Sequence, residues 1–172
     1  MKARLLAIDP GYRELGMAFF IGQELEDYSV KSLRRPNRNG FRILSLMLTR
    51  IMEEKRPTVF ALEKNNFQNL PQNKLVVKVV GRIKKAAETH GLPVYEFAPG
   101  TIKKAVAGDG RATKRELSKT VSLLFPYLRL YRDTGKKGKD RYHQNMFDAI
   151  AVGLTYFKFK SEKTIQNYES DR

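Results

Sequence analysis

The stretch LLAIDPGYRELGMAFF, residues 5–20, decides how the fold begins. An apolar run typical of a buried strand ends at the carboxylate of Asp9, and Pro10 and Gly11 then turn the chain into a second apolar run. We therefore expect neighbouring strands over residues 3–9 and 15–21. A charge at the end of a buried strand is held on rigid backbone, at the sheet edge where ligands gather in open α/β folds.

The remaining pattern predicts an α/β fold with a five-stranded mixed sheet and helices on both faces. Further strands are expected over 24–30, 59–63 and 93–99. Helices are expected over about 15 residues from Phe41, and over 75–87, 101–106, 114–125 and 145–159. Thr113 and Glu116 have the spacing of a capping box at the start of the 114–125 helix. The basic, glycine-punctuated segment 133–145 is expected to be a mobile loop.

Length and composition favour one intracellular domain. We expect it to span residues 1–160, followed by a charged, flexible tail over 161–172. The chain contains no cysteine, which excludes disulfides, thiolate metal sites and a cysteine nucleophile and suits a reducing compartment. No apolar stretch approaches the roughly 18 residues of a membrane span.

The charge balance predicts a polyanionic partner. The chain has 33 Lys and Arg against 18 Asp and Glu, a formal net charge of +15. Nucleic acid is the first expectation, and adhesion to an anionic membrane surface is the second.

Three carboxylates stand out against this basic background. Glu63 ends the apolar run VFALE (59–63), just as Asp9 ends the first strand. If the two strands are neighbours, their carboxylates meet at one edge, where mutual repulsion favours a divalent cation or a shared proton. Asp148 lies in NMFDAIAVG (145–153), whose small residues let a helix approach the sheet closely. Each acid alone could equally be an ordinary ion-pair partner, but the shared position of Asp9 and Glu63 favours a joint site.

The donor types indicate a hard metal ion. Asp and Glu oxygens, with only two histidines in the chain, favour Mg²⁺ or Mn²⁺ over Zn²⁺. Two such ions about 3.5–4 Å apart can activate a water and stabilise a leaving oxygen in phosphodiester hydrolysis. A basic protein with this cluster is most directly interpreted as a metal-dependent nuclease.

Four blocks of the sequence together resemble a known family. IDPGYRELGMA, ALEKNNF, PVYEFAPGTIKKAVAGDGRATKREL and FDAIAVG, in this order, resemble the RuvC Holliday-junction resolvases over about residues 4–157. The resemblance implies a ribonuclease H-like fold and a homodimer that makes paired, metal-dependent nicks in four-way DNA junctions during recombination and repair. It also implies that Asp9, Glu63 and Asp148 hold two Mg²⁺ or Mn²⁺ ions per site.

The fourth ligand position of the family is occupied by an amide in this chain. The family usually has Asp, and sometimes His, three residues before its last Asp; here that residue is Asn145. Residues i and i+3 share a helix face, so Asn145 could still offer a neutral and weaker oxygen ligand. His143 is five residues before Asp148 and on another face of a regular helix. It could act as a ligand or base if the helix begins after it, or else be a solvated loop residue.

Basic residues near the carboxylates suit contacts to DNA phosphates. Those flanking the glycine turn at 108–110 are Lys103, Lys104, Arg111, Lys114 and Arg115. The resemblance places Lys103 and Lys114 near the scissile strand, where one of them would position the phosphate or stabilise its developing charge. A second basic group comprises Lys136, Lys137, Lys139 and Arg141. For each lysine, a solvated helix face is the alternative interpretation.

Two further features take their interpretation from the resemblance. Phe67 lies where the family has an aromatic wedge for the junction centre, although the family's preceding aromatic is Asn66 here, and Phe67 could equally anchor its loop in the core. The apolar stripe of the helix from about residue 73 to 87 is core in part, and the family places its dimer contact on this helix.

Other functions stay open at this point. One alternative is a junction-binding protein that cuts poorly because Asn145 replaces a charged ligand, and another is a broader nuclease for flaps, forks or RNA-containing hybrids. A branch-migration motor as partner is neither required nor excluded. The expected location is the cytoplasm with the nucleoid, or a viral or organellar equivalent.

Overall fold

The computed structural model describes residues 2–33, 38–64, 71–132, 134 and 137–170. The strands are β1 (Arg4–Pro10), β2 (Glu14–Ile21), β3 (Glu24–Ser32), β4 (Val59–Glu63) and β5 (Val94–Phe97). The helices are α1 (Arg38–Lys55), α2 (Pro71–Thr89), α3 (Pro99–Ala107), α4 (Lys114–Leu124), the 3₁₀ turn η1 (Pro126–Leu128), α5 (Arg129–Arg132) and α6 (Lys137–Ser170).

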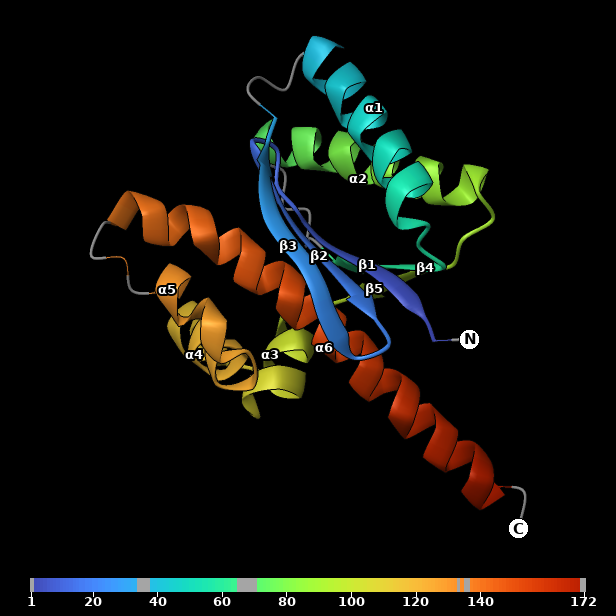
Figure 1. The fold of residues 1–172 in the computed structure, drawn as a ribbon, viewed down its shortest axis with the longest axis vertical. Helices are drawn as coiled ribbons and strands as arrows, with labels where there is room; N and C mark the ends of the chain where they lie inside the picture. The colour runs from blue at the N-terminus through green and yellow to red at the C-terminus, as the bar shows by residue number, and fades with distance from the viewer. Residues whose placement is uncertain (1, 34–37, 65–70, 133, 135–136, 171–172) are drawn as a thin grey trace.

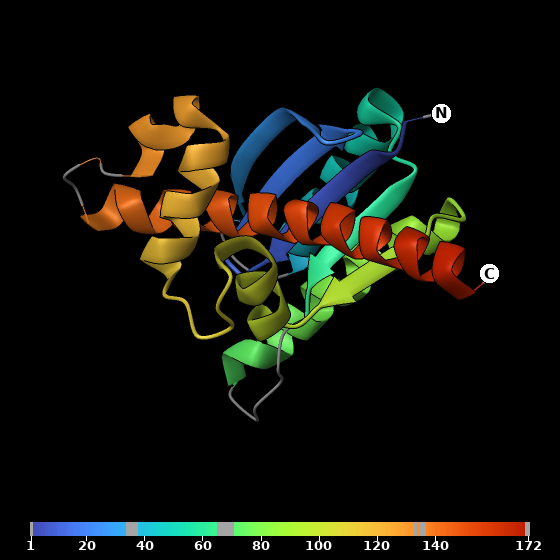
Figure 2. The same ribbon diagram turned by 90° about the horizontal axis from the view of Figure 1, so that it is seen from below.

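The strands form one mixed sheet in the order β3-β2-β1-β4-β5. β1, β2 and β3 are an antiparallel meander, whereas β4 runs parallel to β1 and β5 runs parallel to β4. Figure 1 shows α1 and α2 on one face of the sheet and α3, α4 and α6 on the other. Seen from below, α6 lies across the strands (Figure 2). The expected five-stranded mixed sheet with helices on both faces is confirmed.

Alternation along the strands divides the interior into two cores. In β1, Leu5 and Ala7 pack in the core that includes α6, whereas Leu6 and Ile8 pack in the core beneath α1 and α2. β4 follows the same rule, because Val59 and Ala61 face α6. Successive side chains of a strand point to opposite faces. Asp9 and Glu63, the next residues of this series, therefore lie on the α6 face.

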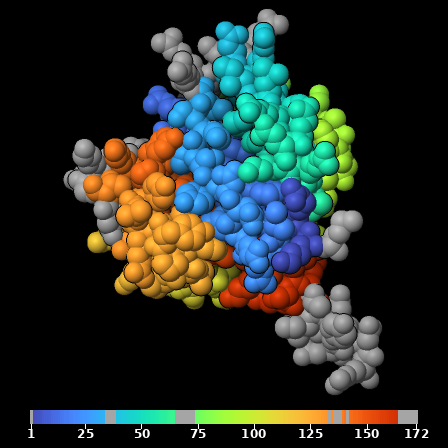
Figure 3. All heavy atoms as spheres, in the orientation of Figure 1, coloured from blue at the N-terminus to red at the C-terminus, as the bar shows by residue number. Residues whose placement is uncertain are grey.

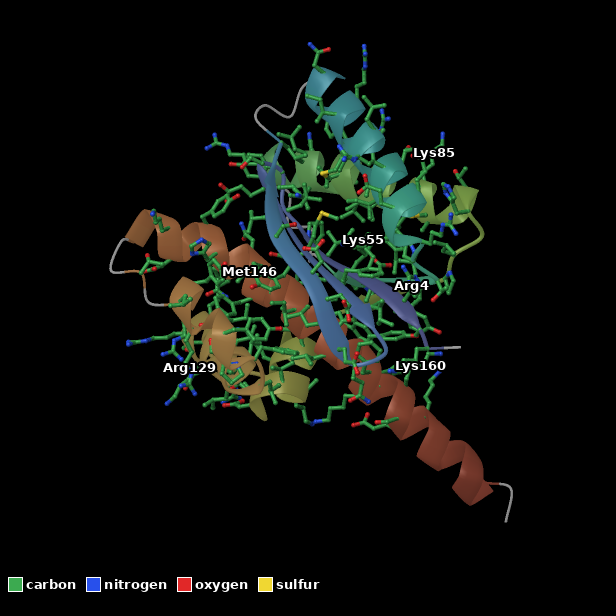
Figure 4. All side chains as sticks on the ribbon, viewed as in Figure 1. Arg4, Lys55, Lys85, Arg129, Met146 and Lys160 are labelled. Carbon is green, nitrogen blue, oxygen red and sulfur yellow. The ribbon has the colours of Figure 1, made fainter. Side chains whose placement is uncertain are left out.

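Small residues let α6 lie close to the sheet, as the sequence predicted. A Cβ placed on Gly153 would come within 2.3 Å of the Phe20 ring, and one on Gly16 within 1.7 Å of the Asn145 backbone oxygen. Met146, labelled in Figure 4, is 3% exposed in the core between α6 and the strands.

The start of α6 corrects one expectation. The helix begins at Lys137, not near Asn145, so the expected mobile loop is wrong for residues 137–145. Tertiary contacts explain this start: Asp140 Oδ1 accepts hydrogen bonds from the backbone N and Oγ1 of Thr134 (2.9 and 2.6 Å), and the Tyr142 hydroxyl donates to the Val30 carbonyl (2.9 Å). At its other end α6 runs past residue 161 to Ser170 and projects beyond the sheet in Figure 1.

Other boundaries differ by a few residues. α1 begins at Arg38 instead of Phe41, and the short elements η1 and α5 were not predicted.

The capping box of α4 is confirmed. Thr113 Oγ1 accepts from the Glu116 backbone N (3.2 Å), and Glu116 Oε2 accepts from the Thr113 backbone N (2.7 Å).

The surface of Figure 3 shows β3 between α1 on one side and the segment α4–α5 on the other.

Within the described part of the chain, no helix combines the length and apolarity needed to cross a membrane.

Candidate functional site

The ends of two neighbouring parallel strands bring Asp9 and Glu63 together. Ile8 is paired with Leu62 in the β1–β4 register, so the next step along both strands sets Asp9 beside Glu63. Both side chains lie on the face that α6 covers, and both are partly buried. The predicted meeting of these carboxylates at one sheet edge is confirmed.

α6 carries Asp148 to the same edge. Asp148 is only 4% exposed. The next two residues of α6, Ala149 and Ile150, belong to the core between α6 and the sheet. The close approach depends on Gly16, the cross-strand partner of Asp9, because any side chain there would collide with the α6 backbone at Asn145.

Two side chains hold the buried carboxylate of Asp148 from opposite oxygens. Lys114 Nζ donates to Oδ2 at 2.9 Å, and Gln144 Nε2 donates to Oδ1 at 2.8 Å. Lys114 begins α4, and Gln144 lies one turn before Asp148 on α6. The predicted proximity of Lys114 to the acids is confirmed. Gln144 was missed, although the i, i+4 spacing of Gln and Asp is a known helix pairing.

The carboxylates perturb one another. Burial raises the pKa of Asp9 well above its usual range, and Asp148 and Glu63 raise it further, whereas Lys114 opposes the shift. Burial, and then Asp148, raise the pKa of Glu63 to about 7 against the opposing charges of Lys114 and Lys103. Burial acts to lower the pKa of Lys114, but Asp148, followed by Asp9 and Glu63, outweighs it and leaves this pKa raised. The edge therefore holds excess negative charge that a cation or proton must balance.

This donor set fits a divalent cation by its chemistry. The three side chains offer hard oxygen ligands of the kind that Mg²⁺ and Mn²⁺ prefer, and their repulsion disfavours full ionisation without a cation. Among the described residues, no three Asp, Glu, His or Cys side chains are arranged so that they could already hold a metal ion. The Lys114 ammonium instead supplies the positive charge beside Asp148.

Asn145 and His143 have different surroundings. The Asn145 amide Nδ2 donates to Glu14 Oε2 at 3.0 Å, and Glu14 is a residue that sequence reasoning did not select. His143 lies inside α6, where its Nδ1 is 3.1 Å from the Tyr131 carbonyl oxygen and its ring packs edge-on against Tyr131 and Tyr142. Because the helix begins before His143, the condition under which it could turn toward Asp148 is not met.

A basic groove between α4 and α6 adjoins Asp148. It has a volume of about 790 Å³ and is lined by Lys114, Arg115, Ser118, Arg132, Asp140, Gln144, Asn145 and Phe147. Two of the predicted DNA contacts, Lys114 and Arg115, thus face one concavity. Arg132 was not predicted, because the short helix that carries it gives no strong pattern in the sequence.

The other predicted DNA contacts are spread around the site. Lys103 is close enough to Glu63 to affect its pKa, while Lys104 and Arg111 are exposed on either side of the 108–110 turn. Phe67 lies outside the described residues, as do the side chains of Lys137 and Arg141.

Comparison with known proteins matches nearly the whole chain to one group. The sequence model of the family "Crossover junction endodeoxyribonuclease RuvC" matches residues 5–156. A protein of that name from Petrotoga mobilis is 32% identical over 127 residues, covering 70% of this chain and 78% of the relative. The one from Thermomicrobium roseum is 28% identical over 173 residues, covering 96% and 99%.

Solved structures share the fold. The Thermus thermophilus RuvC solved in complex with a Holliday junction substrate superposes with a TM-score of 0.71 at 24% identity, covering 89% of this chain and 92% of that one. The yeast mitochondrial Holliday junction resolvase gives 0.71 at 16% identity, covering 97% and 83%.

Proposed function

This chain belongs to the RuvC family of crossover junction endodeoxyribonucleases and is a Holliday junction resolvase, and we propose that Asp9, Glu63 and Asp148 hold its divalent metal ions. The observation that carries the assignment is the meeting of these carboxylates, from two parallel strands and one helix, at a single edge of the sheet. Burial and then the neighbouring carboxylates raise the pKa of Asp9 and of Glu63, and this cost of ionisation supports a cation at this edge.

The protein's own groups divide the work around this centre. Bound Mg²⁺ or Mn²⁺ would activate water and stabilise the leaving oxygen in phosphodiester hydrolysis. Gln144 holds Asp148 through Oδ1, so this ligand keeps one orientation. Lys114 provides a positive charge at the same carboxylate, where it can position the scissile phosphate or stabilise its developing charge. Lys103 is assigned the same type of role on the Glu63 side.

The groove between α4 and α6 is the proposed path of the cut strand. Arg115 and Arg132 lie along it with Lys114, so that phosphates leading to the acids meet positive charge. Lys104 and Arg111, exposed beside the 108–110 turn, are proposed to contact flanking phosphates. Phe67, Lys137 and Arg141 keep their predicted DNA roles as proposals.

We further propose that the protein acts as a homodimer through α2. Paired nicks require two sites, and α2 and its neighbour α1 leave large apolar side chains exposed: Val77 is 45% exposed, Ile43 54% and Leu46 60%. Buried in an interface, these side chains would be removed from water.

The decisive experiment measures the cleavage of three substrates in the presence of each metal ion. Purified protein is incubated with a mobile four-way junction, a fork and an RNA–DNA hybrid, in Mg²⁺ or Mn²⁺, beside the Asp9→Asn variant. We expect paired nicks in the four-way junction that need metal and are lost in the variant. Tight junction binding without cleavage would favour the junction-binding alternative, and equal cutting of all three substrates would favour the broader nuclease. Activity that persists in Asp9→Asn would overturn the site.

A further inference from the structure

Asn145 is joined to a carboxylate from a different element. Its Nδ2 donates to Oε2 of Glu14 at 3.0 Å, and Glu14 is the first residue of β2. In β2, Ala18 and Phe20 pack on the α6 side, so alternation puts Gly16 and Glu14 on that side too. The pair thus lies beside the edge that holds Asp9, since Gly16 is the cross-strand partner of Asp9.

The chemistry of this pair decides which way the amide faces. An amide has a donor end, Nδ2, and an acceptor end, Oδ1, whereas an ionised carboxylate only accepts. Glu14 therefore selects the orientation in which Nδ2 faces it and Oδ1 is directed elsewhere. A neutral partner, or none, would permit both orientations.

The backbone of Asn145 is already fixed by packing. Its carbonyl oxygen lies where a Cβ on Gly16 would be, so α6 sits against β2 at this residue without space to shift. The side chain also lines the groove that contains Lys114 and Gln144, the two partners of Asp148. On this fixed backbone, the hydrogen bond to Glu14 restricts the rotation of the Asn145 amide.

We propose that Glu14 is a positioning residue that holds the Asn145 amide with Oδ1 presented to a divalent cation in the Asp9–Glu63–Asp148 site. This inference rests on the proposed function of that site. Partners that orient a metal ligand commonly contribute 10- to 100-fold to metal affinity. Glu14 would thereby help a neutral amide to serve as a ligand beside three carboxylates.

The test is a double-mutant cycle read by Mn²⁺ affinity, measured by titration calorimetry of the full-length protein. In the Asn145 background, Glu14→Gln preserves shape but can present its own NH₂ group, so the amide is free to turn over. We expect Mn²⁺ affinity to fall about 10-fold. In the Asn145→Asp background there is no amide to orient, so the same substitution should cost clearly less, leaving only the effect of one lost negative charge near the cation. A residue that is merely structural, or that acts only through its charge, would lower affinity by the same factor in both backgrounds.

Matched controls separate orientation from charge. Glu26→Gln makes the same charge change on the exposed surface of β3 and should leave Mn²⁺ affinity unaltered in both backgrounds. Glu14→Met removes the acceptor without adding a donor, so it should lower affinity in the Asn145 background and, like Glu14→Gln, cost clearly less in the Asn145→Asp background. Thermal melting confirms that each variant is folded. Should Glu14→Gln prove unfolded, the Glu14→Met cycle decides alone.

The outcomes distinguish this inference from the function it rests on. If the wild type binds Mn²⁺ and Asp148→Asn loses that binding, but Glu14→Gln changes affinity in neither background or by the same factor in both, the positioning role is overturned while the metal site stands. A wild type that binds no Mn²⁺ would overturn both.

Discussion

Nζ of Lys114 lies 2.9 Å from Oδ2 of Asp148, so the first residue of α4 meets the middle of α6. A lysine in the first turn of a helix opposes the helix dipole, typically at a cost of about 0.3–1 kcal/mol. The ion pair with the buried carboxylate of Asp148 offsets this cost and holds the start of α4 beside the site.

Lys114→Met is expected to reduce junction cleavage about 100-fold, the usual effect of removing one group that stabilises transition-state charge. Single-turnover cleavage of a four-way junction measures it. Lys119→Met, on the same helix at an exposed position, is the control and should cut at the wild-type rate. Equal rates for both variants would remove Lys114 from the reaction.

The stability of the metal-free protein should fall as pH rises. The pKa of Glu63 is about 7 in the folded protein, against about 4.3 for an unperturbed glutamate, so the folded state binds more protons between these values. The free energy of unfolding, from urea titrations in EDTA, is therefore expected to decrease between about pH 4.3 and 7, with Asp9 contributing in the same direction. Glu63→Gln should flatten this slope.

A control for that slope is Glu88→Gln, which removes one exposed carboxylate of α2. Mg²⁺ affinity should show the opposite trend and increase up to about pH 7, since metal binding requires deprotonated ligands. A slope unchanged by Glu63→Gln would contradict the pKa assignment.

Arg115→Ala should lower the salt sensitivity of junction binding. If Arg115 contacts one phosphate, the slope of log K against log salt becomes smaller by about 0.9. Fluorescence anisotropy with a labelled junction at several salt concentrations measures the slope. Arg50→Ala, on α1 and paired with Glu54, removes the same charge away from the groove and should leave the slope as it is.

Gly16→Ala should destabilise the protein although it removes no functional group. The added methyl would lie 1.7 Å from the Asn145 backbone oxygen, so α6 must move away from β2, at a cost of about 1–3 kcal/mol or more. Gly81→Ala in α2 meets nothing within 4 Å and should instead stabilise by about 0.5–1 kcal/mol. Denaturant unfolding of both variants checks the pair, and similar effects would contradict the packing described.

Val77→Glu should convert the protein into monomers if α2 forms the dimer contact. A charge buried against apolar surface is strongly unfavourable, whereas on an exposed face it is tolerated. Sedimentation velocity reports the state. Leu130→Glu, on α5 and 82% exposed, is the matched control and should keep the wild-type oligomeric state. A dimer that survives Val77→Glu would place the interface elsewhere.

The parts of this structure that the sequence predicted are those set by local patterns. Asp9 and Glu63 each end a short apolar run. Because side chains alternate between the two faces of a strand, both carboxylates point to the face covered by α6. The spacing of Thr113 and Glu116 likewise specifies its own capping box. Such features depend on neighbours within a few residues, which is why they could be predicted.

Features that depend on distant packing were missed. The start of α6 relies on Thr134 and on contacts of Tyr142 and His143 with other elements, none of which has a periodic signature. The Glu14–Asn145 hydrogen bond joins the start of β2 to α6. It could be predicted only from the close contact between Gly16 and the α6 backbone, which the sequence does not reveal.

The continuity of α6 has a consequence for how the protein opens. A helix of 34 residues is about 50 Å long, and Asp148 lies in a stretch whose neighbours Ile150, Ala151 and Val152 are fully buried against the sheet. We expect that fraying at either end stops short of this stretch, so that its backbone amides exchange only when α6 leaves the sheet. Asp148 is then expected to belong to the slowest-exchanging cooperative unit and to stay at the edge formed by β1 and β4 in any partly unfolded state that retains this unit.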